Sequence, residues 1–96
     1  LKENSKYLRD GLKICGFETL KSETQIVPIL IGADEKAILF SKRLFERGIF
    51  GPCVRWPAVE KGKSRIRVTI MANHTREQMD YFIKSALEIG RELGII

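Results

Sequence analysis

The most regular alternation of apolar and polar residues in the chain covers residues 64–71. Ile66, Val68 and Ile70 alternate there with Arg65, Arg67 and Thr69. This period of two predicts a strand over Ser64–Met71 with one face buried. Arg65 and Arg67 then project from the same face, about 6.6 Å apart along the strand, and can share one anionic ligand or bind two neighbouring ones.

Three other stretches have apolar residues at helical spacing. We expect a short amphipathic helix over Asn4–Cys15, with Gly16 as its left-handed cap. We expect a second helix that begins at Asp34 as its N-cap and ends at Gly48. The stripe of this second helix that should face the core is Ala37, Phe40, Ser41, Leu44 and Phe45.

The last helix is expected from about Arg76 to Leu93, with Gly94 as its cap. Thr75 and Gln78 before it have the spacing of a capping box, in which each side chain bonds to the backbone of the other residue. The side of this helix that should be buried is Met79, Phe82, Ile83, Ala86, Leu87 and Gly90.

Two more apolar segments are predicted to be extended. Ile26–Ile31 is too short for a helix and is rich in β-branched residues. Pro28 within it has no N–H for the ladder, so this strand should lie at a sheet edge or point Pro28 outward. Ile49–Arg55 is the second such segment, and it is broken by Gly51–Pro52.

The residues between these strands predict a hairpin, because Pro57 and Gly62 are typical of a turn before Ser64–Met71. The resulting order, αβαββα, predicts an α+β fold with a small, mostly antiparallel sheet and helices on one face. Arg65, Arg67 and Thr69 should lie on the other face. That face is either solvated or covered by something anionic or by another domain.

Length and cysteine content predict one small domain over residues 1–96, in a cytoplasmic protein. The chain begins at Leu1 without an initiator Met, a signal peptide or a membrane-length apolar run, so we expect it to be a piece of a longer polypeptide. Cys15 and Cys53 have no CxxC spacing, which favours reduced thiols over a disulfide. With one His and no ligand cluster, we expect no metal site.

The charge pattern points to a small anionic ligand. The net charge is +5, from 17 Lys and Arg against 12 Asp and Glu. Most of these basic residues alternate with acidic ones on the predicted helices, which argues against a nucleic-acid surface. Only five concentrate locally: Arg55, Lys61, Lys63, Arg65 and Arg67.

Candidate chemistry is sparse, because the chain has no GxSxG, HExxH, P-loop or GxGxxG motif. His74 is interpreted first as a residue that packs or hydrogen-bonds at the entry to the last helix, and second as a catalytic group. Glu77 and Asp80 fall on the polar side of that helix and form no carboxylate pair. Trp56 is either an interface anchor or a turn-packing residue.

The two arginines also have two interpretations. They either form a solvated strand face with ion pairs to nearby acids, or they recognise a carboxylate or phosphate. Arg suits the second role because its guanidinium is planar, permanently charged and bidentate.

Several segments together resemble the C-terminal small domain of the α-oxoamine synthases. These segments are Glu23-Thr24-x-Ile-Val-Pro28, Leu44-x-x-x-Gly48-Ile-Phe, Arg55-x-Pro-x-Val59, Gly62, Ser64-Arg-Ile-Arg67 and His74-Thr75. The resemblance covers nearly the whole chain. It implies the aspartate-aminotransferase-like fold of enzymes that use pyridoxal phosphate (PLP). Within the family, the 8-amino-7-oxononanoate synthase group of biotin biosynthesis is most similar, and the glycine C-acetyltransferase group is the alternative.

The resemblance implies an acyltransferase that condenses an amino acid with an acyl-CoA in a homodimer. By this match Arg67 holds the substrate carboxylate. Ala58 takes the place of a threonine that is associated with the substrate side of the site. The lysine that binds PLP lies upstream in the family's large domain, so the cofactor is expected to be held there and the isolated chain to be inactive.

Two other classes of function remain open from the sequence alone. One is a basic binding module that uses its arginine face on RNA, although RNA-binding sheets usually present aromatic side chains. The other is a structural interaction domain. If the chain is the small domain of a larger enzyme, it should expose an apolar face, for which the candidates are Ile29, Ile31, Phe50 and Trp56.

Overall fold

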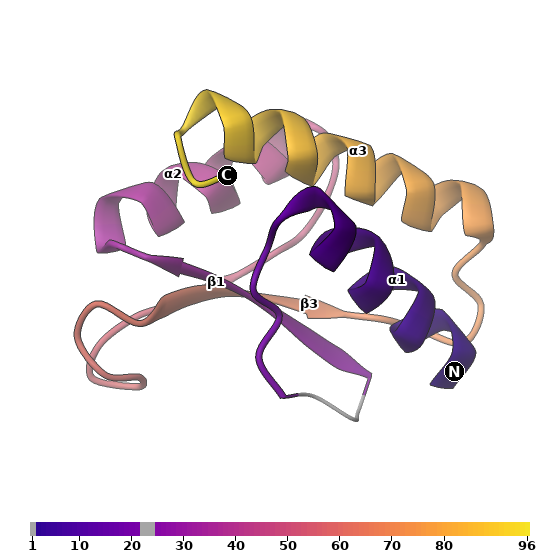
Figure 1. Cartoon of the computed structure of the whole chain (residues 1–96), viewed down its shortest axis with the longest axis horizontal. Coiled ribbons are helices and arrows are strands. Elements are labelled where there is room, and N and C mark those ends of the chain that lie inside the picture. Colours follow the sequence, from indigo (N-terminus) through magenta and orange to yellow (C-terminus); the bar gives the residue numbers. More distant parts are fainter. Residues whose placement is uncertain (1, 22–24) are drawn as a thin grey trace.

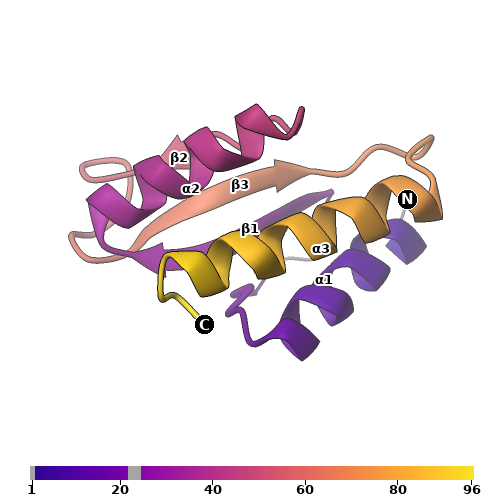
Figure 2. The ribbon, with the colours of Figure 1, turned by 90° about the horizontal axis from the view of Figure 1, so that it is seen from above.

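Three helices lie on one face of a three-stranded antiparallel sheet in the computed structural model, which describes residues 2–21 and 25–96 (Figure 1). The elements are α1 (Lys2–Cys15), β1 (Ile26–Gly32), α2 (Asp34–Glu46), β2 (Cys53–Val54), β3 (Ser64–Thr69) and α3 (Arg76–Glu92). Seen from above, the helices cover the sheet (Figure 2). The predicted α+β class and element order are confirmed.

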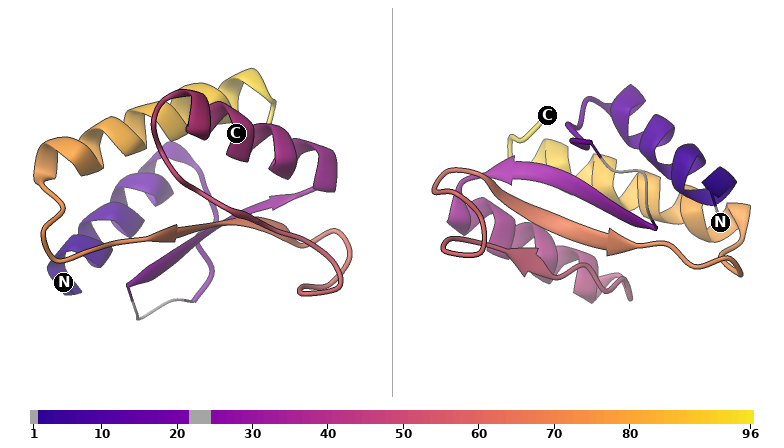
Figure 3. Two further views of the ribbon diagram at one scale, coloured as in Figure 1. Left: turned by 180° about the vertical axis from the view of Figure 1, so that it is seen from behind. Right: turned by 90° about the horizontal axis from the view of Figure 1, so that it is seen from below.

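The sheet has the order β1-β3-β2, so the arginine-bearing strand is central. Its buried face is built from pairs such as Val27 with Val68 and Ile29 with Ile66. Its outer face pairs Pro28 with Arg67 and Leu30 with Arg65. No helix covers this outer face among the described residues, as the view from below shows (Figure 3).

Pro28 occupies an edge strand, as its missing N–H requires. The Arg67 N–H donates to the Pro52 carbonyl oxygen (2.9 Å), so the backbone polar groups of Arg67 face the β2 side. The pair of Pro28 and Arg67 is therefore of the non-hydrogen-bonded kind, and β3 needs no donor from Pro28. The predicted edge position is confirmed, and the alternative, an outward-pointing ring nitrogen, holds as well.

The core lies between the inner sheet face and the helices. Its largest fully buried side chains include Leu8, Leu12, Ile29, Phe40, Leu44, Ile66 and Ile89. Phe17 and Phe40 meet edge to face, with ring centroids 5.9 Å apart. Ile29 was expected on an exposed face, and that prediction is wrong because its pairing with Ile66 points it inward.

Helix capping agrees with the sequence at α3 and departs from it at α2. Thr75 and Gln78 form the predicted capping box, with bonds of 3.1 Å and 2.9 Å. Asp34 is not the N-cap of α2. Ala33 takes that position without a side-chain bond, and Asp34 is the first helical residue.

Two helices bury partly different residues from those predicted. Phe45 is 72% exposed, because it lies about 100° further round the helix than the buried Leu44. Ser41 is half-buried and donates to the Gly51 carbonyl (2.5 Å). On α3, Ser85 and Ile89 are buried, whereas Ile83 and Leu87 are only half-buried. The buried arc of α3 is thus rotated relative to the prediction.

Two strands are shorter than predicted. β3 ends at Thr69, although Ile70 stays buried and its N–H donates to the Gln25 carbonyl (2.8 Å). The extended segment 49–55 contributes only the two residues of β2. Pro52 accepts the bond from Arg67 but has no N–H to return, which limits the ladder at this end.

Candidate functional site

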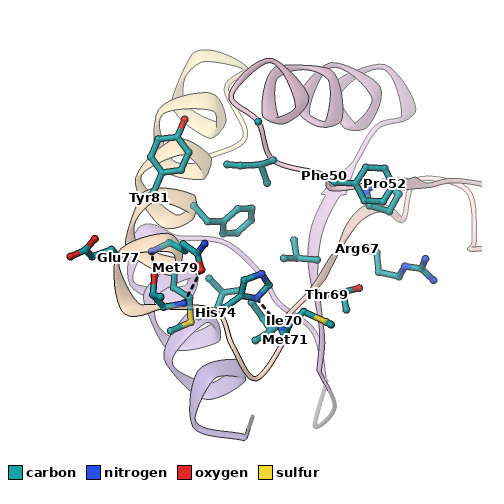
Figure 4. Close-up of a pocket in the computed structure, with 17 residues that line it drawn as sticks. Phe50, Pro52, Arg67, Thr69, Ile70, Met71, His74, Glu77, Met79 and Tyr81 are labelled. Carbon is teal, nitrogen blue, oxygen red and sulfur yellow. Dashed lines mark hydrogen bonds between the residues drawn. The ribbon is translucent and has the colours of Figure 1, made fainter.

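A groove of about 830 Å³ opens beside the end of β3 (Figure 4). It runs between β3, the segment that leads into β2, and the first turns of α3. Its lining residues are Leu8, Gly48, Ile49, Phe50, Pro52, Arg67, Val68, Thr69, Ile70, Met71, His74, Thr75, Glu77, Gln78, Met79, Tyr81 and Phe82. Most of these residues are apolar, and Arg67 is the only Lys or Arg among the described residues that line the groove.

Arg67 stands at the rim of this groove with its side chain free. It is exposed on the outer face of β3, and Figure 4 shows the guanidinium extending away from α3. Within residues 2–21 and 25–96, the guanidinium has no hydrogen bond and no ion pair. Its backbone, in contrast, is fixed by the bond to Pro52. A residue whose backbone is fixed and whose guanidinium is exposed is suited to bind an anion.

Arg65 lies on the same sheet face as Arg67, but its side chain is less exposed and is hydrogen-bonded. It is half-buried, and its Nε donates to the carbonyl of Lys63, just before β3 (3.2 Å). The structure therefore separates the two arginines that the sequence left equivalent.

His74 is held by the turn between β3 and α3. Its Nδ1 accepts a hydrogen bond from the Met71 N–H (2.8 Å). The Asn4 amide from α1 donates towards the carbonyls of Met71, Ala72 and His74 at 3.3, 3.4 and 3.3 Å. This geometry confirms the first interpretation of His74, a hydrogen-bonding residue at the helix entry. The sequence did not indicate this role of Asn4, because no local pattern predicts a hydrogen bond to residues about 70 positions away.

The loop over residues 55–63 projects beside the sheet and carries Trp56 and Ala58. The Lys61 ammonium lies 4.8 Å from the Trp56 ring centroid, so Trp56 is packed within its turn and is still 56% exposed. The Ala58 N–H donates to the Arg55 carbonyl (2.9 Å), which makes Ala58 part of the same turn. The structure does not bring Ala58 into the lining of the Arg67 groove.

Asp80 on α3 is bonded to a side chain of α1. The Tyr7 hydroxyl donates to the Asp80 carboxylate, and this bond, followed by desolvation, raises the pKa of Tyr7. Arg76 stacks on the Tyr7 ring, 3.8 Å from its centroid. Asp80 thus ties α3 to α1. That Glu77 and Asp80 do not act together as a catalytic pair stays a prediction.

Within the described residues, the cysteines form no disulfide, and no group of side chains is arranged to bind a metal ion. Cys15 and Cys53 are both free, and burial raises the pKa of the Cys53 thiol. No group of three His, Cys, Asp or Glu side chains that could hold a metal ion occurs in the part of the chain that the structure describes. In the same part, no helix has the length and apolar character needed to cross a membrane.

Comparison with known proteins identifies the family. Residues 1–85 match the model of aminotransferase class I and II. The chain belongs to this family. The motif carrying Glu23 and Thr24 lies partly outside the described residues. The other motifs fall on β1, the end of α2, the 55–63 loop, β3 and the entry to α3.

Relatives of this aminotransferase-family domain are named 8-amino-7-oxononanoate synthase. The protein from Thermoanaerobacter pseudethanolicus is 44% identical over 94 residues, which is 98% of this chain and 24% of the relative. The protein from Lysinibacillus sphaericus is 44% identical over 96 residues, which is 100% of this chain and 25% of the relative. The chain therefore spans about a quarter of the length of the curated relatives it matches.

The solved structures agree on the fold. Serine palmitoyltransferase from S. paucimobilis, solved with a bound adduct of PLP and myriocin, matches with a TM-score of 0.88 and 29% identity, over 98% of this chain and 24% of that one. The resemblance to the α-oxoamine synthases is thus confirmed, and the proteins it points to are PLP enzymes.

The described residues that line the groove do not fit the covalent site of that cofactor. No lysine lines the groove beside Arg67 within the described ranges. Arg67 offers a charge for a carboxylate or phosphate but no amine. That PLP is held by the family's large domain stays an expectation.

Proposed function

We propose that this chain is the C-terminal small domain of a PLP-dependent α-oxoamine synthase. The whole enzyme condenses an amino acid with an acyl-CoA, and we assign it to the 8-amino-7-oxononanoate synthase type, of biotin biosynthesis. The observation that carries the proposal is Arg67 in the Ser64-Arg-Ile-Arg67 motif. Its guanidinium stands on the open sheet face and has no partner among residues 2–21 and 25–96. The two longer relatives named above support the acyltransferase assignment.

In this proposal Arg67 binds the amino-acid carboxylate. The carboxylate presents two oxygens in a plane, and the guanidinium fork can donate to both. The cofactor, when bound by the rest of the polypeptide, supplies the chemistry on the amino group. Arg67 supplies orientation and the counter-charge. Ala58 is proposed to face the substrate side from the 55–63 loop, where the family commonly has a threonine.

The open sheet face is proposed to meet the rest of the polypeptide, in a cytoplasmic homodimer. Ile26, Pro28 and Leu30 are half-buried beside Arg67 on this face. An aliphatic floor of this kind offers no aromatic platform for stacking bases. The described geometry therefore favours the enzyme domain over the RNA-binding module.

The test uses the full-length polypeptide beside the 96-residue chain. Each is mixed with PLP, reduced with borohydride and analysed by mass spectrometry. We expect a stoichiometric lysine adduct only in the full-length protein. A stoichiometric adduct at one lysine of the short chain would contradict the proposal.

A second assay separates the two synthase types. Release of free CoA that depends on an added amino acid is measured with acetyl-CoA and with a longer acyl-CoA that ends in a carboxylate. The name 8-amino-7-oxononanoate requires the longer substrate, so faster turnover of that substrate is expected. A preference for acetyl-CoA would assign the glycine C-acetyltransferase type instead.

A further inference from the structure

Arg67 is bordered by a proline on each neighbouring strand. On one side, Pro28 of β1 is its direct partner in the antiparallel ladder. On the other side, the carbonyl of Pro52 accepts the Arg67 N–H at 2.9 Å. Both prolines are half-buried, whereas Arg67 is exposed.

The two rings share the outer face with the arginine stem. Residues directly opposite in an antiparallel ladder place their side chains on the same face, with Cβ atoms about 4.5–5.5 Å apart. The pair of Pro28 and Arg67 is non-hydrogen-bonded, which is the closer of the two kinds. Cys53 pairs with Ile66, and one further step along the same register sets Pro52 opposite Arg67.

The sheet accommodates Pro28 on its edge strand, but strand pairing does not require a proline at position 28 or at position 52. Proline lacks a ladder donor and is disfavoured within strands. At Pro52 this leaves the bond with Arg67 one-sided and limits β2 to two residues. A β-branched residue at either position would serve strand pairing better.

We propose that Pro28 and Pro52 are positioning residues for the Arg67 guanidinium, an inference that rests on the proposed role of Arg67. An arginine stem packs its methylenes along apolar surface and leaves its charged head in water. Two rigid rings, which have almost no side-chain freedom of their own, narrow the rotamers open to that stem. The guanidinium is then held ready for a carboxylate before the substrate arrives.

The expected effect follows from the cost of ordering a flexible side chain on binding. For one rotamer-rich side chain this cost corresponds to about 2- to 12-fold in affinity. Pro28→Ala and Pro52→Ala should therefore weaken carboxylate binding within that range while Arg67 itself is kept. Pro52→Ala also supplies a donor for the ladder, so its effect on affinity cannot be attributed to a weakened sheet.

The test measures what the carboxylate contributes, in the full-length enzyme loaded with PLP. The affinities of L-alanine and of ethylamine, which is the same molecule without its carboxylate, are determined by spectral titration, and glycine with methylamine provides a second pair. Within each pair, the affinity of the amino acid divided by that of the amine measures what the carboxylate, and hence its contact with Arg67, contributes to binding. A general loss of structure would weaken both ligands together. Leu30→Ala is the matched control, because Leu30 lies on the same face but opposite Arg65.

We expect each proline variant to lower the affinity ratio by about 2- to 12-fold, and Leu30→Ala to leave it unchanged. Pro28→Val, which refills the face with a bulky strand former, should recover part of the loss. If Arg67→Ala collapses the ratio but both proline variants keep it, the positioning role is wrong and the role of Arg67 stands. If Arg67→Ala also keeps the ratio, the proposed function itself fails.

Discussion

The hydroxyl of Ser64, at the start of β3, donates a hydrogen bond to the carboxylate of Asp34, in the first turn of α2. Ser64 is fully buried and Asp34 is exposed. The bond ties the central strand to the helix above it, and the carboxylate also lies favourably at a helix N-terminus.

We predict that Asp34→Ala destabilises the domain by about 1–3 kcal/mol, because it leaves the buried Ser64 hydroxyl without a partner. Asp34→Asn keeps an acceptor oxygen and should cost less. Urea unfolding of the three proteins measures the difference. Equal losses in both variants would show that the hydrogen bond is not the cause.

Two glycines offer a matched test of core packing. A Cβ at Gly90 would approach Phe17 Cζ at 2.7 Å, and the Phe17 ring is fixed against Phe40. A Cβ at Gly11 would meet the half-buried Ile83 side chain, closest at its tip, 2.5 Å from Cδ1 and 3.3 Å from Cγ1. That tip can turn away, whereas the ring cannot.

Gly90→Ala is therefore predicted to destabilise the domain by about 1–3 kcal/mol, the usual cost of overpacking. Gly11→Ala should be neutral or stabilising, because alanine in a helix is favoured over glycine by about 1 kcal/mol. Thermal melts of both variants check the contrast. A stable Gly90→Ala variant would mean that Phe17 is free to move.

The pairing of α2 with α3 should depend on pH. Arg47 donates a hydrogen bond to Glu88 (2.6 Å), and this bond lowers the pKa of Glu88 from its ordinary 4.5. A carboxyl whose pKa is lower in the folded state stabilises the fold above its unfolded pKa. That contribution is lost as the pH falls through the folded-state pKa.

We predict that lowering the pH from neutral to well below 4.5 lowers the melting temperature of Glu88→Gln by less than that of the unsubstituted protein. Glu60→Gln is the control, because the Glu60 side chain forms no ion pair within the described ranges. Identical acid sensitivity of Glu88→Gln and the unsubstituted protein would rule out this contribution.

Local patterns in the sequence were enough to predict most of the fold. The alternation around Ile66 gave β3 and its two faces, and the spacing of Thr75 and Gln78 gave the entry to α3. Pro28 placed β1 at the edge. Each of these rests on interactions within a few residues, or on a backbone property of one residue, which a sequence displays directly.

The predictions of burial were wrong where contacts between residues distant in the sequence decide which side of a helix is buried. Phe45 is as apolar as Phe40, and only the orientation of α2 over the sheet exposes one and buries the other. The rotation of α3 depends in the same way on α1. At the site, the sequence singled out both arginines, but the difference between them depends on hydrogen bonding that needs three-dimensional coordinates.

Exposed aromatic residues predict self-association of the isolated chain. Phe50 is 78% exposed and Phe45 is 72% exposed, and both border a hollow beside α2. If the chain is one domain of a larger enzyme, such surfaces are covered there by other parts of the polypeptide. We expect the 96-residue chain to associate at high concentration in sedimentation experiments.

Phe50→Ser should increase the monomer fraction, whereas Ile14→Ser, on the outer side of α1, provides a control for the general loss of an exposed apolar side chain. A chain that stays strictly monomeric at high concentration would count against the proposed packing of this surface in a larger enzyme.

The central claim is that Arg67, and not Arg65, binds the amino-acid carboxylate, and it is tested most directly by amino-acid titration of full-length enzyme variants. Arg67→Ala should lose about 1.5–3 kcal/mol of binding free energy, or about 10- to 150-fold in affinity. Arg67→Lys should recover only part of this loss, since it keeps the charge without the fork.

Arg65→Ala is the control on the same strand face, and thermal melts of every variant separate binding from folding. The account predicts near-normal amino-acid affinity in Arg65→Ala and a large loss in Arg67→Ala. Normal affinity in Arg67→Ala, or equal losses in the two variants, would contradict it.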